Sequence, residues 1–289
     1  MTEINGKTIT EVVKKLCIDA NYYIGNDVEN ALKRGYETET KPLAKEVLGK
    51  ILENSQIAGN ENMPICQDTG MAVVFIEIGQ DVHVTGNLED AINEGVRKGY
   101  CEGYLRKSVV KDPLDRVNTN DNTPAVVHYE IVEGDEIKIT VAPKGFGSEN
   151  MSGIKMLKPS DGKKGILDYV IELISKGGGN PCPPIVVGIG IGGTMEKAAL
   201  LSKKALLLPV DYKNPNPYYN DMQCEILQLI NESKIGPMGW GGDTTALGVN
   251  ILTYPTHIAG LPLAVNIGCH VTRHKTAIIS SKEEVVYED

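Results

Sequence analysis

Three cysteines occupy turns rich in glycine and proline that lie far apart in the chain: Cys66, Cys182 and Cys269. Three thiolates in such turns could hold three irons of a [4Fe–4S] cluster and leave the fourth iron open to a substrate. Because iron–sulfur clusters normally take four protein ligands, a missing fourth ligand favours chemistry at the iron over electron transfer. Catalytic zinc sites follow the same rule, since they keep one coordination position open.

The cysteine spacing is also consistent with other interpretations. The sequence contains no Cys-x-x-Cys pair, so the usual ferredoxin and zinc spacings are missing, and only the fold could bring the three cysteines together. A cysteine within an apolar run is more often a core residue than a ligand. A core or neutral role is therefore predicted for the cysteines that lie within helical patterns or at a helix end: Cys17, Cys101 and Cys224.

Polar residues beside the first cysteine could perform acid–base chemistry or bind an anion. Gln67 and Asp68 follow Cys66 directly, and Asp68 could act as a general acid or base, or only cap a turn. Arg106 and Lys107 come at the expected end of the next helix. Either could bind a carboxylate, although a positive charge at a helix C-terminus is also favourable by itself.

Basic and titratable residues flank the third cysteine: His257, His270 and Arg273. A single histidine is usually a structural residue. Their grouping near a possible ligand makes this segment a candidate part of the site.

A glycine-rich run from Gly188 to Gly193 follows an expected strand and precedes an expected helix. It satisfies the G-x-G-x-x-G pattern of dinucleotide-binding folds, and Asp211 lies near the position of the ribose-binding acid. The alternative is a close-packed turn that binds an anion at a helix N-terminus. The run Asn214–Pro217 also interrupts the strand–helix pattern that a dinucleotide fold would continue.

A second glycine cluster, from Gly236 to Thr245, surrounds Trp240, the chain's single tryptophan. So many glycines indicate backbone that is pressed against a ligand or a subunit. An ordinary irregular loop is the alternative interpretation.

Composition limits the classes of partner. The chain has 289 residues, of which 41% are hydrophobic and 23% are charged, as is typical of globular proteins. Its net charge of −9 argues against nucleic acid or an anionic membrane as the general partner, so an acidic substrate would need a local basic pocket. The polar N-terminus predicts no signal peptide and no apolar run predicts a membrane span, so we expect a cytoplasmic protein with reduced thiols.

Hydrophobic periodicity predicts a mixed α/β fold with helices at the N-terminus, from about Ile9 to Ala58. In the first half, the patterns predict a strand at 71–78, a helix at 88–104, and a hairpin formed by 126–132 and 136–141. In the second half they predict helices at 165–176, 194–207 and 216–233, and strands at 185–189, 246–254, 261–266 and 276–279. We expect a lobe boundary near residues 155–180 and an acidic tail, 283–289, that is solvated or packs on a partner.

Five motifs together resemble the class I, iron–sulfur fumarate hydratases, in order and over nearly the whole chain. They are Pro64–Gly70, Gly147–Asn150, Gly188–Thr194, Gly236–Gly242 and Asn266–His270. The chain is similar to the separate α subunit of the two-subunit form, and to its close relative, the α subunit of L(+)-tartrate dehydratase. The motifs are specific for the family and weak for the substrate.

The resemblance implies two α/β lobes around a buried [4Fe–4S] cluster with one open iron. By motif, the three ligands correspond to Cys66, Cys182 and Cys269. The residues that correspond to substrate contacts, with Asp68 also as the catalytic acid or base, are Gln67, Asp68, Arg106, Gly147 and His257. The implied reaction is the reversible hydration of fumarate to (S)-malate, and the alternatives are dehydration of L(+)-tartrate and hydration of mesaconate.

The resemblance also implies a partner. Single-chain members of the family carry a C-terminal β domain that supplies a threonine, arginines and a lysine to the site. Since this chain ends at Asp289, we expect a separate β subunit to supply them, in an α2β2 assembly. Two other classes remain open: a nicotinamide-dependent oxidoreductase that uses the Gly188–Gly193 run, and a non-catalytic electron-transfer or assembly subunit with Cys101 or Cys224 as fourth ligand.

Overall fold

The computed structural model describes residues 2–282 and 284–288. The chain divides into two compact units, each made of separate stretches of sequence. The first unit comprises the chain up to Gly25, then Asn54–Gly145, and the chain from Arg273 onward. The second unit comprises Asn26–Glu53 and Phe146–Thr272, so residues 155–180 lie inside it. No helix among the described residues is long and apolar enough to cross a bilayer.

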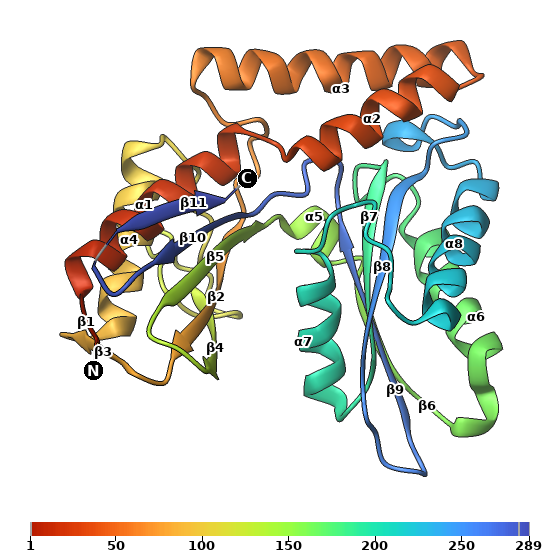
Figure 1. The fold of residues 1–289 in the computed structure, drawn as a ribbon. Coiled ribbons are helices and arrows are strands. Elements are labelled where there is room, and N and C mark those ends of the chain that lie inside the picture. Colours follow the sequence, from red (N-terminus) through yellow and green to blue (C-terminus); the bar gives the residue numbers. More distant parts are fainter. Residues whose placement is uncertain (1, 283, 289) are drawn as a thin grey trace. The chain divides into compact units, whose positions relative to one another are not determined.

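The first unit is built on a mixed five-stranded sheet with the strand order β11-β10-β5-β2-β4 (Figure 1). The strands are β2 (Met71–Gly79), β4 (Val126–Val132), β5 (Ile137–Lys144), β10 (Lys275–Ile279) and β11 (Val285–Glu288). Two helices, α1 (Gly6–Tyr22) and α4 (Leu88–Glu102), and the short paired strands β1 (Thr2–Asn5) and β3 (Val82–Thr85) complete it.

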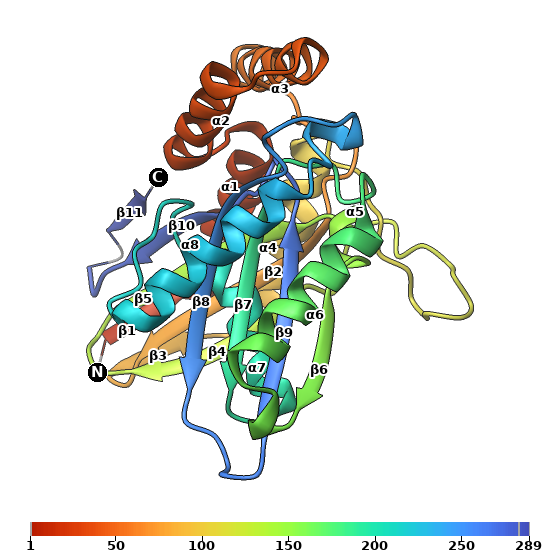
Figure 2. The same cartoon turned by 90° about the vertical axis from the view of Figure 1, so that its right-hand side faces the viewer.

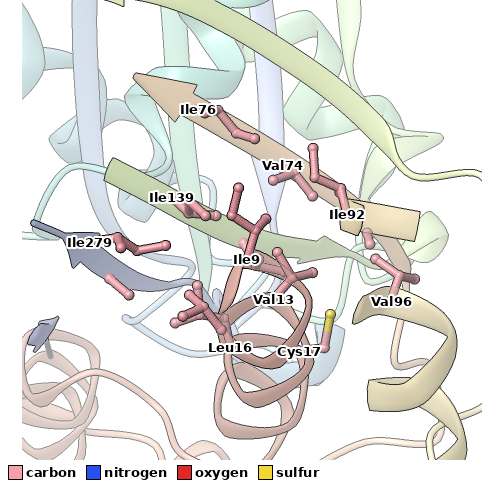
Figure 3. Close-up of a cluster of buried hydrophobic side chains, with 14 of the residues drawn as sticks. Ile9, Val13, Leu16, Cys17, Val74, Ile76, Ile92, Val96, Ile139 and Ile279 are labelled. Atoms are coloured by element: carbon pink, nitrogen blue, oxygen red, sulfur yellow. The ribbon is translucent and has the colours of Figure 1, made fainter. Parts of the chain in front are cut away.

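The core of the first unit lies between α1, α4 and the sheet. Apolar side chains of α1 at helical spacing, including Ile9, Val13 and Leu16, are buried against the strands (Figure 3). The two helices approach closely because α4 carries glycine at the contact, where a Cβ on Gly95 would lie 2.7 Å from the carbonyl oxygen of Thr10. Cys17 lies fully inside this core, and burial raises the pKa of its thiol to about 12, which confirms its predicted core role.

The predicted hairpin of residues 126–132 and 136–141 is wrong. Both strands exist, as β4 and β5, but β2 lies between them, parallel to β4 and antiparallel to β5. The local turn signal cannot reveal an inserted strand. Because β2 is the most continuously buried strand of this sheet, it is favoured at an interior position, while the more exposed β4 takes the edge.

The acidic tail is also more ordered than expected, since Val285–Glu288 forms β11 and pairs antiparallel with β10. The remaining tail positions 283 and 289 lie outside the described residues.

The second unit is built on a four-stranded sheet with the order β6-β9-β7-β8 (Figure 2). Its strands are β6 (Gly153–Leu157), β7 (Ile185–Gly192), β8 (Ala246–Tyr254) and β9 (Leu261–Gly268). Helix α7 (Met195–Ala205) covers one face, and α6 (Gly162–Gly177) and α8 (Pro217–Glu232) cover the other (Figure 1). The unit also contains α2 (Asn26–Thr38), the short α5 (Phe146–Glu149), and the 3₁₀ turns η1 (Pro159–Asp161) and η2 (Pro237–Gly239), while α3 (Pro42–Glu61) runs from the second unit into the first.

Three glycines of the dinucleotide-like run, Gly188, Gly190 and Gly192, lie within strand β7, and only Gly193 lies in the turn before α7. A Cβ on Gly188 would lie 2.2 Å from the carbonyl oxygen of Ser202, and one on Gly190 would lie 2.1 Å from that of Ala198. Both carbonyls belong to α7, so the glycines allow this helix to lie directly on the strand. Close packing of helix on strand therefore explains the glycine spacing that suggested nucleotide binding.

Candidate active site

Cys66 lies in a tight turn of the first unit, between α3 and β2, and is half-buried. The backbone N–H of Asp68 donates to Cys66 Sγ at 3.4 Å, and that of Gly70 donates to Asp68 Oδ1 at 3.1 Å. Gly70 has a φ of +74°, and a Cβ there would lie 2.7 Å from the backbone of Lys144. The turn therefore requires glycine, and it aims a backbone N–H at the sulfur of Cys66. The side chain of Gln67 is exposed beside it.

Thr69 attaches Arg106 to this turn. The backbone N–H of Arg106 donates to Thr69 Oγ1 at 2.9 Å, and Thr69 Oγ1 donates to the carbonyl oxygen of Arg106 at 3.2 Å. The Arg106 side chain is exposed. Arg106 does not end the helix, as the sequence suggested, because α4 stops at Glu102. Its position beside Asp68 is thus set by the threonine and not by a helix terminus.

Two buried side chains, which the sequence did not single out, complete the support of the turn. Tyr100 OH donates to the carbonyl oxygens of Thr69 and Gly70 at 2.8 Å and 3.0 Å. Asn122 Nδ2 donates to the Gly70 carbonyl oxygen at 3.2 Å, and its Oδ1 accepts from the N–H of Ser108 at 2.7 Å. The turn and the chain after Arg106 are therefore held by side-chain hydrogen bonds, which have no local sequence signature.

In the second unit, the sheet brings two of the three cysteines to one edge. Cys182 precedes β7 and Cys269 follows β9, and these strands run antiparallel with Val186 opposite Gly268. The Nδ1 atom of His270 lies 2.9 Å from the carbonyl oxygen of Cys182, which joins the two turns directly. Both thiols are half-buried. His270 thus has a structural contact, and strand register accounts for the pairing of residues distant in sequence.

Helix α5 is fixed at the same edge, because β6, which follows it, pairs antiparallel with β9. Gly147 is exposed there, and a Cβ on it would lie 3.6 Å from the carbonyl oxygen of Asn180 in the Cys182 turn. Glu149 connects three elements, since its carboxylate accepts from Lys203 Nζ at 2.5 Å and from Asn266 Nδ2 at 3.0 Å. Glu149 stands in the sequence motif but was not among the candidates.

The glycine loop around Trp240 packs on the Cys182 turn. The N–H of Met238 donates to the Pro183 carbonyl oxygen at 2.7 Å, and a Cβ on Gly239 would lie 2.8 Å from the Cα of Gly179. The side chain of Trp240 is exposed. The close backbone contact observed is therefore with the Cys182 turn of the same chain, and contact of this loop with a ligand or a subunit stays a prediction.

His257 lies apart from the two cysteines of its own unit. It is exposed in the connection between β8 and β9, at the end of β9 opposite to Cys269. The eight residues of β9 separate the two ends, which at the rise of a strand is about 25 Å. The structure thus does not bring His257 to Cys182 and Cys269, and its substrate role stays a prediction.

The three turn cysteines fit an iron–sulfur group by their chemistry. Each is a half-buried thiol outside any disulfide, and soft thiolates are the ligands such clusters take. Cys66 belongs to the first unit and the other two belong to the second. Across the described residues, no group of three or more histidine, cysteine, aspartate or glutamate side chains is arranged to hold a metal ion. Cys101 and Cys224 are exposed on α4 and α8.

Comparison with known proteins gives one family and a set of named relatives. The family model described as fumarate hydratase (Fumerase) matches residues 10–278. A putative L(+)-tartrate dehydratase subunit alpha of Methanocaldococcus jannaschii is 43% identical over 272 residues, which cover 92% of this chain and 95% of the relative. The L(+)-tartrate dehydratase subunit alpha of Escherichia coli strain K12 is 32% identical over 275 residues, which cover 94% of this chain and 90% of the relative.

Proposed function

Because the chain belongs to the class I fumarate hydratase family, whose membership implies an iron–sulfur cluster, we propose that it is the α subunit of a hydro-lyase that removes water from L(+)-tartrate. The sequence alone favoured fumarate, but the similar proteins that cover most of the chain bear the tartrate name. The observation that carries the hydro-lyase assignment is an arrangement of three groups in the first unit. The Cys66 thiol and the Asp68 carboxylate belong to one turn, and a hydrogen bond to Thr69 fixes the backbone of Arg106 next to that turn.

We assign the cluster ligands to Cys66, Cys182 and Cys269, so that both units contribute. The half-buried position of all three thiols supports this assignment, as does the pairing of the latter two turns through His270. When bound, the cluster supplies a Lewis-acidic iron that polarises a substrate hydroxyl.

The chain's own residues then bind the substrate and move protons. The Arg106 guanidinium pairs with a carboxylate of the dianion, which provides the local positive charge that a protein of net charge −9 needs. The N–H of Gly70 holds the Asp68 carboxylate in the turn two residues after Cys66, so we assign proton transfer to this carboxylate. Gln67 and the backbone of Gly147 orient the substrate. Loss of a hydroxyl from one carbon and a proton from the other releases water and leaves the enol of oxaloacetate.

A separate β subunit completes the site in this proposal, in an α2β2 assembly. The similar proteins are named as alpha subunits, which supports a partner chain. The β subunit would supply the remaining groups that hold the substrate.

Fumarate hydration to (S)-malate is the second candidate function. The matching family is described as fumarate hydratase, and carboxylate binding with proton transfer does not by itself separate fumarate and (S)-malate from L(+)-tartrate. Mesaconate, an unsaturated dicarboxylate like fumarate, is a further candidate.

The test is a comparison of substrates with the αβ complex purified without oxygen. We expect kcat/KM for L(+)-tartrate to exceed that for (S)-malate, fumarate and mesaconate at least tenfold, with about four irons per α chain. A preference for fumarate and malate would establish the second candidate instead. No water addition or loss with any of these substrates, in a complex with full iron content, would refute the hydro-lyase proposal.

A further inference from the structure

Arg273 is a buried arginine of the first unit that contacts the Cys66 turn. Its side chain is 8% exposed. Nη2 donates to the carbonyl oxygen of Asp68, and Nε donates to the carbonyl oxygen of Pro143 at 3.4 Å. The guanidinium therefore joins the turn to the end of β5.

The third nitrogen of the guanidinium is unusual. Nη1 of Arg273 is buried and has no hydrogen-bond partner. A buried donor without a partner costs free energy, and burial of a charged group costs more, so packing alone would favour an apolar residue at this position. A buried polar group without a partner needs an explanation, and one such explanation is a role in the chemistry of a nearby site.

Gly145 lies next to the Asp68 carboxylate. A Cβ on Gly145 would lie 3.1 Å from Asp68 Oδ2 and 3.7 Å from Arg273 Nη2. Both groups therefore face the same small space, which the glycine keeps open. Gly145 does not have a positive φ, so the absence of its Cβ matters for space and not for backbone conformation.

We propose that Arg273 is the positioning residue of Asp68, and that Gly145 provides the space in which the Asp68 carboxylate takes its working orientation. The inference rests on the proposed function, in which the Asp68 carboxylate transfers the proton. Arg273 fixes the backbone of Asp68 through the carbonyl, while the N–H of Gly70 fixes Oδ1. Both contacts constrain the orientation of the Asp68 carboxylate. A displacement of about 1 Å at such a group is enough to slow a reaction about a hundredfold.

The test uses Arg273→Lys, Arg273→Gln and Gly145→Ala in the αβ complex. We expect Arg273→Gln to lower kcat about 10- to 100-fold, with KM changed less than about threefold and iron per chain unchanged. Arg273→Lys should recover part of kcat, because the ammonium reaches one carbonyl and not both. Gly145→Ala should lower kcat in the same way while the Arg273 side chain itself is retained. Arg97→Gln, an exposed arginine of the same unit, is the matched control.

The iron count and the electron paramagnetic resonance signal after brief oxidation provide readouts that do not depend on turnover. If substrate still perturbs this signal in Arg273→Lys and Gly145→Ala while kcat is low, the positioning role is supported. Unchanged kcat in both variants, or a fall in kcat that only follows lost iron, would overturn it. If Arg273→Gln does not fold, the other two variants decide. An inactive wild-type complex would refute the proposed function and this inference together, whereas an active wild type with unaffected variants refutes the inference alone.

Discussion

The Cys66 turn of the first unit and the cysteine edge of the second unit are held in different ways. The first depends on side chains that hydrogen-bond to backbone, from Thr69, Tyr100, Asn122 and Arg273. The second depends on strand register and close backbone contact, with Gly239 against Gly179. Most of the polar groups proposed to act on the substrate lie in the first unit. In the proposed function, the first unit therefore carries the groups that tune the reaction, and the second unit carries two of the three cluster ligands.

Substitution of the cysteines tests the proposed cluster ligands. We expect Cys66→Ser and Cys269→Ser each to abolish activity and cluster together, because both are proposed ligands. Iron and sulfide counts with activity assays measure this, and Cys224→Ser, an exposed helix position, is the control. Full activity in Cys66→Ser would remove the first unit from the cluster and break the comparison.

Loss of the Arg106 side chain tests the substrate-binding role of the first unit. Arg106→Ala should raise KM about 10- to 100-fold, as removal of a charge-assisted hydrogen bond of about 1.5–3 kcal/mol implies. Cluster content should stay at the wild-type level, which a KM titration and an iron count on the same sample would show. If the cluster were lost instead, the carboxylate role would have no support.

Two substitutions with smaller expected effects, one in each unit, test the roles of the two units separately. Thr69→Val removes the clamp on Arg106, and Ser152→Ala removes the hydroxyl that accepts from the N–H of Ile267 at 3.0 Å. We expect Thr69→Val to raise KM about fivefold, since about 1 kcal/mol of positioning is lost. Ser152→Ala should leave KM unchanged and increase the rate of cluster loss in air. The opposite pattern would mean that substrate binding depends on the second unit.

The smallest effect is expected at the loop that packs on the Cys182 turn. The Lys234 ammonium, with Thr40, holds the pKa of Asp243 below its ordinary value. Since a lowered pKa stabilises the folded state above the ordinary pKa of the carboxyl, this contribution is present at pH 7 and is lost as pH falls below about 4. Because the pair is at the surface, Asp243→Asn should destabilise the protein by no more than about 1 kcal/mol at pH 7, with unchanged KM. Thermal unfolding measures this, and a large loss of activity would show that the loop takes part in the reaction.

Local sequence patterns determined which segments of this protein form helices and strands. The helices α1, α4, α6, α7 and α8 and the strands β2, β7, β8 and β9 lie where periodicity predicts them, within a few residues. The physical reason is that helix and strand periods are properties of neighbouring residues. The motifs likewise identified the family, because turn residues such as Gly70 are required by backbone geometry next to them.

Only the tertiary structure decided which elements became neighbours. The insertion of β2 between β4 and β5, the pairing that places Cys182 beside the Cys269 turn, and the separation of His257 from both all depend on strand order. The contact of Arg273 with Asp68 joins residues far apart in sequence. The packing of α7 on Gly188 and Gly190 likewise showed that these glycines are needed for close contact between a helix and a strand. Such contacts form where buried surfaces and hydrogen-bonding groups satisfy one another across the fold, and no local sequence period encodes them.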